Sequence, residues 1–184
     1  PTADGSFEYG NDGDGYVVGS EMLLRYKPDS RFFGWVAYTL SRSARRLNKN
    51  QELTLFQYDQ THILTTLGSY RLGRGWEFGV RFRLISGPLI TPCNSGIFSS
   101  ASGAYVCVPG QTYSERLPMF HQLDLRLDKQ WVYDAGWRLS TYLDILNVYN
   151  RRSPEGVAYN YTSTQSTYQS GLPFIPSVGV RAEF

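Results

Sequence analysis

Apolar and polar side chains alternate with a period of two residues over much of this chain, whereas helical periodicity is hard to find. The segment 76–84 shows the alternation most clearly. Its even-numbered positions are all apolar, and its odd-numbered positions are Glu77, Gly79, Arg81 and Arg83. Because successive side chains of a strand point to opposite faces, this segment predicts a β-strand with one apolar and one charged face.

The same alternation predicts seven strands in all, at 16–26, 33–42, 62–72, 76–84, 122–133, 137–145 and 177–184. Each has roughly the 9–11 residues that a tilted strand needs to cross a bilayer. Lys129 interrupts the apolar face of the fifth strand. The facing of the second strand stays open, because apolar residues occupy both sets of positions: Val36, Tyr38 and Leu40 against Phe33, Trp35 and Ala37.

Short and long connections alternate strictly between these strands. The short ones, 28–31, 73–75 and 134–136, contain residues that tight turns favour. The long ones are 43–61, 87–119 and 151–176. An up-and-down meander places all short turns at one end and all long loops at the other, which is the layout of an outer-membrane barrel with periplasmic turns and extracellular loops. Residues 1–15 would then belong to another extracellular loop.

The predicted fold class is therefore all-β: an antiparallel up-and-down transmembrane β-barrel segment, about seven strands of a larger barrel. A compact soluble domain rarely tolerates several loops longer than about 12–15 residues. Alternation alone does not say which face points inward, so a soluble barrel that binds an apolar ligand inside stays open. That alternative requires apolar residues to pack together in a closed core: Phe78, Val80, Phe82, Leu123, Leu125 and Val180.

Composition changes this picture little. Aromatic residues make up 15% of the chain, and several lie beside the short turns: Tyr26, Phe32, Phe33, Trp76, Trp131, Tyr133 and Trp137. These residues resemble an aromatic girdle at a membrane interface. The alternative is that they are ordinary core residues that flank the turns. The mean hydropathy of −0.35 is compatible with a membrane barrel, because only every second residue of a strand faces lipid. No apolar run reaches about 18 residues, so no transmembrane helix is expected. The net charge of +2 gives no indication of a nucleic-acid partner.

The two cysteines, Cys93 and Cys107, lie in a stretch rich in Gly, Ser and Pro and lack metal-ligand spacing. We expect them to form a disulfide, which could contribute about 3 kcal/mol by closing this loop. Such a bond requires an oxidising compartment, such as the periplasm or the cell surface. Two unpaired thiols in a cytosolic protein are the alternative.

The last strand ends on an aromatic residue. Ser177, Gly179, Ala182 and Phe184 resemble the signal that the barrel-assembly machinery reads at the C-terminus of outer-membrane proteins, although Ala182 stands where a bulkier residue is usual. A C-terminal strand that happens to end in Phe is the alternative.

Two runs near the C-terminus, 120–129 and 143–152, resemble TonB-dependent receptors. The second run resembles the family pattern D-x-x-N-x-[FY]-N, here Asp144, Asn147, Tyr149 and Asn150. Residues 34–41 also resemble a strand of this family.

This resemblance implies a barrel of about 22 strands around a plug. It also implies uptake of a scarce ligand such as a ferric siderophore, cobalamin or another chelate or glycan across the bacterial outer membrane. The implied partners are outer-membrane lipid, the plug and the remaining strands, the barrel-assembly machinery, and the TonB complex that engages the plug. Neither a plug nor its TonB-binding box is found in this sequence, so we expect these to be the last strands of a larger barrel.

No enzyme motif is found, and neither a cofactor nor a metal site is expected, since His62 and His121 lie on separate strands without a ligand cluster. Charged residues are expected to face the barrel lumen: Glu77, Arg81, Arg83, Asp124, Arg126, Asp128, Arg138 and Asp144. They form either a solvated wall that pairs with the plug or a guide for a charged ligand. Tyrosines of the long loops are candidates for ligand capture: Tyr105, Tyr113, Tyr159, Tyr161 and Tyr168. A small self-contained outer-membrane barrel or adhesin with interaction loops remains the alternative function.

Overall fold

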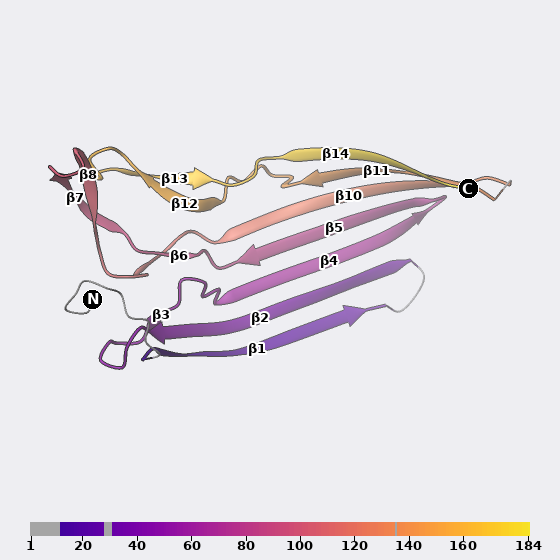
Figure 1. Cartoon of the computed structure of the whole chain (residues 1–184). Helices are drawn as coiled ribbons and strands as arrows, with labels where there is room; N and C mark the ends of the chain where they lie inside the picture. The colour runs from indigo at the N-terminus through magenta and orange to yellow at the C-terminus, as the bar shows by residue number, and fades with distance from the viewer. Residues whose placement is uncertain (1–11, 28–30, 135) are drawn as a thin grey trace.

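The computed structural model describes residues 12–27, 31–134 and 136–184. One antiparallel sheet dominates it, and the long strands are neighbours in their order along the chain (Figure 1). These strands are β1 (Asp14–Tyr26), β2 (Phe32–Arg46), β4 (His62–Gly73), β5 (Trp76–Ile85), β10 (Phe120–Val132), β11 (Arg138–Leu146) and β14 (Ile175–Glu183). The all-β class and the antiparallel meander are therefore confirmed.

The long strands extend further than the alternation predicts at the loop end of the sheet. β1 begins at Asp14, although residues 1–15 were expected to form a loop, and β2 continues to Arg46 instead of ending at residue 42. The two extensions pair with each other from Asp14–Arg46 onward, so each supplies the backbone partners of the other. The expected turn at 28–31 and the expected loop at 1–15 lie partly outside the described residues, as does Ala135 of the turn at 134–136.

The two ends of the sheet differ in their connections (Figure 1). At the hairpin end, β4 and β5 are joined through Arg74 and Gly75, and both residues adopt positive φ angles, of 53° and 77°. At the loop end, the long connections fold into short strands: β3 (Thr54–Leu55), β6 (Leu89–Ile90), β7 (Cys93–Ser99), β8 (Ala104–Pro109), β9 (Glu115–Arg116), β12 (Pro154–Tyr159) and β13 (Ser166–Ser170). We call these connections the loop layer.

The register of the sheet sorts the side chains into two faces. One row runs Tyr70, Phe78, Leu127, Leu143 and Val178 across five neighbouring strands, and it belongs to the apolar face. Along each strand, every second residue belongs to this face, and the residues between them point to the opposite face, which contains the charged positions. Because the apolar rows align across all these strands, the face is continuous.

This register settles the open facing of β2. Val36 pairs with Thr66 and Tyr38 pairs with Leu64, so both lie on the apolar face, whereas Phe33 lies on the charged face. Phe33 sits beside the Arg25 guanidinium, which lies 5.3 Å from its ring centre. Phe33 therefore lies on the opposite face from Trp76, another member of the predicted aromatic girdle. Alternation could not detect this, because both faces of β2 contain aromatic residues.

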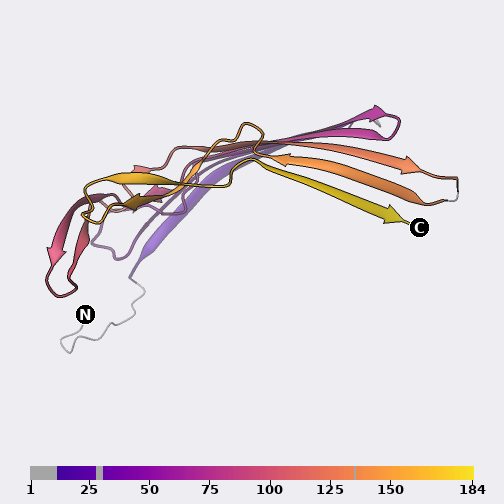
Figure 2. The same ribbon diagram turned by 90° about the horizontal axis from the view of Figure 1, so that it is seen from above.

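The sheet is a single curved layer (Figure 2). In the described part of the chain, only Ala44, Leu89 and Leu117 are buried apolar residues, and they lie at the loop end or in the loop layer. Phe78 and Val180 on the apolar face are 36% and 68% exposed, so they do not pack into a closed core. Among the described strands, β1 and β14 each pair on one side only, so the sheet is open. No described helix is long and apolar enough to cross a membrane.

Candidate functional site

The charged face is organised around Asp124 on β10, which is only 4% exposed. The Arg81 guanidinium donates from Nε and Nη2 to Asp124 Oδ2, at 2.9 and 2.8 Å. The other oxygen, Oδ1, accepts from Gln122 Nε2 at 2.6 Å and from the Asn147 amide at 2.9 Å. Both carboxylate oxygens are thus used, which offsets the cost of burying the charge.

A second group lies next to it on the same face. Arg126 donates to both oxygens of Asp128 at 2.8 Å, and its Nη1 lies 3.5 Å from Asp144 Oδ2. The Arg126 guanidinium also covers the Tyr142 ring, 4.2 Å from its centre. On the neighbouring strand, Glu77 accepts a hydrogen bond from the Ser69 hydroxyl.

The structure therefore brings most of the predicted lumen-facing residues together around a depression of about 360 Å³. Glu77, Arg81, Asp124, Arg126, Asp128 and Asp144 line this depression. Arg83 lies further toward the loop end, opposite Gln122, and Arg138 lies at the hairpin end, opposite Glu183. Four carboxylates and two arginines line the depression, so this part of the face is a wettable wall with a negative balance of charge.

The residues of the D-x-x-N-x-[FY]-N pattern close the loop end of this wall. Asn147 adopts a φ of 55°, a left-handed conformation that Asn tolerates better than most residues. Its side-chain amide donates to the carbonyls of Arg151 and Leu172 at 2.9 and 3.0 Å, and its Oδ1 accepts from the Arg151 amide at 3.0 Å. Asn150, with a φ of 51°, accepts from the Phe174 amide at 2.9 Å. Both asparagines therefore fix the start of the last long loop.

Tyr149 of the same pattern pairs with a histidine of the neighbouring strand. Its hydroxyl lies 2.7 Å from Nδ1 of His121. His62 makes a similar pair, with the Tyr38 hydroxyl 2.8 Å from its Nδ1. Among the described residues, no group of three or more His, Cys, Asp or Glu side chains is arranged to hold a metal ion.

The loop layer contains a buried carboxylate that the sequence did not reveal. Asp59 is 1% exposed and accepts from the Ser43 amide at 2.7 Å, the Thr61 hydroxyl at 2.8 Å and Arg116 Nη2 at 2.6 Å. Arg116 also donates to the carbonyls of Asp59 and Gly87. Burial raises the pKa of Asp59, but these hydrogen bonds and the Arg116 charge outweigh it and hold the pKa below the ordinary value. This cluster, the Asp59 clamp, joins the first long loop to the second.

The Asp59 clamp was missed because an acidic residue in a polar loop has no distinctive spacing. Its partner Arg116 follows far along the chain, in the short strand β9. Only the fold brings the two together.

Three of the five candidate tyrosines lie where the β7–β8 hairpin meets the loop containing β12 and β13. The rings of Tyr105 and Tyr161 make an edge contact with centres 5.4 Å apart. The Tyr159 hydroxyl accepts from the Cys93 amide at 3.0 Å. Tyr113 lies apart from them, with its hydroxyl 2.6 Å from Gln57 Oε1, and Tyr168 is an exposed residue of β13. The five tyrosines therefore do not form one site.

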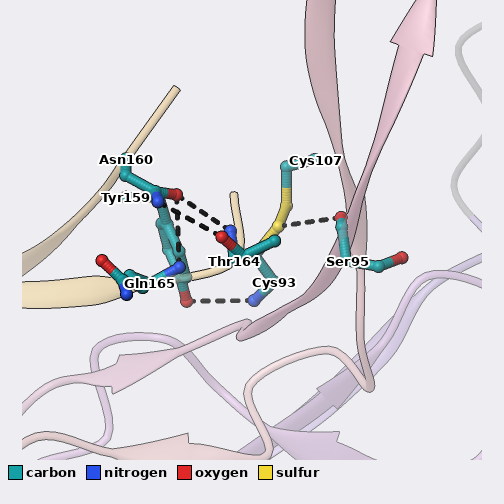
Figure 3. The surroundings of a disulfide bond; sticks show 7 residues. All are labelled: Cys93, Ser95, Cys107, Tyr159, Asn160, Thr164 and Gln165. Carbon is teal, nitrogen blue, oxygen red and sulfur yellow. Dashed lines mark hydrogen bonds between the residues drawn. A yellow bond between two sulfur atoms is a disulfide. The ribbon is translucent and has the colours of Figure 1, made fainter. Parts of the chain in front are cut away.

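Cys93 and Cys107 form the predicted disulfide, which links β7 to β8 beside Tyr159 (Figure 3). The bond lies at the irregularity in the register between Cys93 and Ser95. Next to Tyr159, Asn160 Oδ1 accepts from the amides of Thr164 and Gln165 and shapes the β12–β13 turn (Figure 3). The disulfide and this turn therefore stabilise neighbouring hairpins of the loop layer.

The residues of the predicted assembly signal lie in or directly after β14, and one of them has a packing role. Gly179 pairs with Tyr142, whose ring occupies the space that a side chain at Gly179 would need. Arg126 covers the same ring. Phe184 is fully exposed.

Comparison with known proteins yields no relative for this chain: no protein-family model, no curated protein and no solved structure matches it.

Proposed function

We propose that this chain forms part of the wall of a transmembrane β-barrel in a bacterial outer membrane, with its apolar face toward lipid and its charged face toward a wet interior. The observation that carries the proposal is the sheet itself: one layer with a continuous apolar face that no described residue covers. In water, an exposed apolar surface spanning several strands favours association or aggregation. In a bilayer the same face contacts lipid tails, and the hydrogen bonds of the sheet pair the backbone amides and carbonyls.

The hairpin end has the side chains expected at a membrane interface. Lys129 interrupts the apolar face, but its ammonium reaches the Arg74 carbonyl and lies 5.0 Å from the Trp76 ring centre and 5.4 Å from that of Trp131. A long cationic side chain near the end of a membrane strand directs its charge to the interface in this way. Tyr133 and Trp137 stack at the same end, with ring centres 4.4 Å apart.

The proposed activity is uptake of a scarce ligand by a TonB-dependent transporter of which this chain supplies C-terminal barrel strands. The family-like pattern from Asp144 to Asn150 supports it, because Asn147 and Asn150 have specific roles at the start of a long loop. The disulfide supports a position of the loop layer on the oxidising outer side. The plug, the TonB complex and the assembly machinery are the proposed partners.

The alternative of a small self-contained barrel is less well supported by the topology. The seven long strands that the structure describes form an antiparallel meander, so β1 and β14 run in the same direction. Closing the sheet on itself would join them as a parallel pair, whereas bacterial single-chain barrels have an even number of antiparallel strands. Additional strands between β14 and β1 remove this conflict.

The orientation of the wall can be tested with labels at adjacent positions on opposite faces. Single cysteines replace Phe82 or Arg81 in the full-length protein, and each is labelled with a fluorophore in reconstituted vesicles. We expect nitroxide-labelled lipids to quench the label at position 82. Aqueous iodide that has entered the barrel interior should quench the label at position 81. Equal iodide quenching at both positions, without lipid quenching, would contradict the proposal.

Transport can be tested separately by growth. A strain that lacks the gene is compared with its parent on defined iron, cobalamin and glycan sources. We expect a growth defect on one source class, and loss of the TonB complex should reproduce it. Normal growth on every source together with lost surface adhesion would favour the adhesin alternative.

A further inference from the structure

Three buried side-chain atoms of the described residues have no hydrogen-bond partner: Arg83 Nε, Arg151 Nε and Ser153 Oγ. All three residues line the same pocket, of about 220 Å³, on the charged side at the loop end of β5 and β10. Buried polar groups in folded proteins are almost always hydrogen-bonded, so three exceptions around one small space require an explanation.

The chemistry of the pocket favours an anion. The two guanidinium Nε–H groups can only donate, and the Ser153 hydroxyl can do so as well. Gln122 and Asn147 line the pocket too, and Glu155 is the acidic residue in its wall. The two arginines outnumber this single carboxylate. Planar guanidinium groups match the paired oxygens of a carboxylate, so the donor set suits this class of ligand.

The backbone that presents Arg151 and Ser153 is held in place before any ligand arrives. The Asn147 side chain donates to the Arg151 carbonyl and accepts from the Arg151 amide, which fixes the backbone of Arg151. The Ser153 amide also donates to the Arg151 carbonyl, at 3.1 Å. Ser153 itself is 4% exposed. Arg83 lies over Phe120, 5.5 Å from the ring centre. A backbone fixed in this way lowers the entropy cost of ordering the pocket when a ligand binds.

Asp124 is not a close ion-pair partner of Arg83. The closest approach is 4.0 Å from Arg83 Nη2 to Asp124 Oδ2, whereas Arg81 reaches the same oxygen at 2.8 Å. Arg81 is therefore the principal partner of Asp124, and the Arg83 guanidinium keeps an unused donor beside the pocket.

We propose that Arg83, Arg151 and Ser153 form a carboxylate-binding subsite that holds one carboxylate group of the transported ligand. The inference deepens the proposed transport function and rests on it. The pocket volume is below the roughly 300–1,000 Å³ of pockets that enclose a whole drug-sized ligand, so it suits one anionic arm of a larger molecule.

The test uses the full-length protein purified in detergent, with succinate as the probe and neutral succinamide as the matched control, measured by titration calorimetry. We expect succinate to bind and succinamide not to bind. Arg83→Gln and Arg151→Gln should each weaken succinate binding about tenfold or more, since each removes a charge-assisted hydrogen bond. Ser153→Ala should weaken it about fivefold. Arg181→Gln, on the same face but at the hairpin end, should leave the affinity unchanged.

Several outcomes would overturn the subsite. They are no succinate binding by the wild type, equal binding of succinamide, or equal losses in the Arg181→Gln control. If a carboxylate of the same protein occupied the pocket, the wild type would not bind succinate and Arg151→Gln would lower the thermal unfolding temperature, which would also overturn the ligand assignment. Arg83→Lys, which keeps the charge but loses Nε, guards against a folding defect and should lose affinity while remaining folded. Lipid quenching at position 82 tests the membrane wall without involving this pocket, so the two failures can be told apart.

Discussion

Asp59 in the loop layer and Asp124 in the sheet are two buried carboxylates with nearly the same surroundings. Each accepts hydrogen bonds from a backbone amide and an arginine, from Ser43 and Arg116 in one case and from Asn147 and Arg81 in the other. They differ in what else holds their segments. Asp124 lies in β10, which pairs with β5 and β11 on both sides. Asp59 follows β3, whose pairing with β2 covers only two residue pairs.

The comparison indicates that the sheet and the loop layer depend on different interactions. Backbone ladders hold the sheet whether or not one side chain is removed. Side-chain hydrogen bonds hold the loops to each other, because their backbones share few bonds. Substitutions of equivalent groups should therefore have unequal consequences.

Asp59→Ala is expected to have the largest effect. It leaves Arg116 without its buried partner, and breaking a buried ion pair in this way costs about 3–5 kcal/mol. Limited proteolysis of the full-length protein in vesicles should show faster cleavage in the loops at 47–61 and 86–119. Unchanged cleavage would show that the Asp59 clamp does not hold these loops together.

Removal of the disulfide comes next. The double substitution Cys93→Ser and Cys107→Ser should reduce the local stability of the β7–β8 hairpin by about 3 kcal/mol in the loop-entropy account. Hydrogen exchange of β7 and β8 measures this, and the β12–β13 hairpin serves as an internal reference. Equal loss of protection in both hairpins would mean that the bond stabilises the whole loop layer.

Asp124→Ala should cost less, about 1–3 kcal/mol, because the Arg81 side chain is 43% exposed, against 27% for Arg116, and is more easily solvated. We expect amide protection to fall from Asn147 to Ser153, where the carboxylate holds the turn, and to persist along β10. A general loss of protection in β10 would contradict the distinction between sheet and loop layer.

Acid should have the smallest effect and should act on the loop layer. The pKa of Asp59 is lowered by folding, so its stabilising contribution is fully present above the ordinary value of 3.8 and is lost as the pH falls through the lowered pKa. Loop proteolysis by an acid-active protease should therefore accelerate only at strongly acidic pH. Asp59→Asn should abolish this acceleration, and an unchanged pH profile in that variant would assign it to another group.

The strands could be predicted from the sequence because alternation is a local signal. In segments such as 76–84, alternation alone assigns the apolar and charged faces. The facing of β2 was ambiguous only because aromatic residues occupy both of its faces. The disulfide followed from two cysteines in one stretch. The candidate tyrosines were recognised by residue type alone, and their type does not say which of them meet. The Asp59 clamp and the pocket lined by Arg83 and Arg151 each bring together residues distant in sequence, so only the folded chain reveals them.

The contact between Tyr142 and Gly179 has a consequence for how the final strand docks. The ring fits only over a residue without a side chain, and the residues on either side of Gly179 are both valines. A slip by one position would push a valine against the ring and turn the oily side of the strand toward the ion pairs. Gly179 therefore selects a single register for the pairing of β14 with β11.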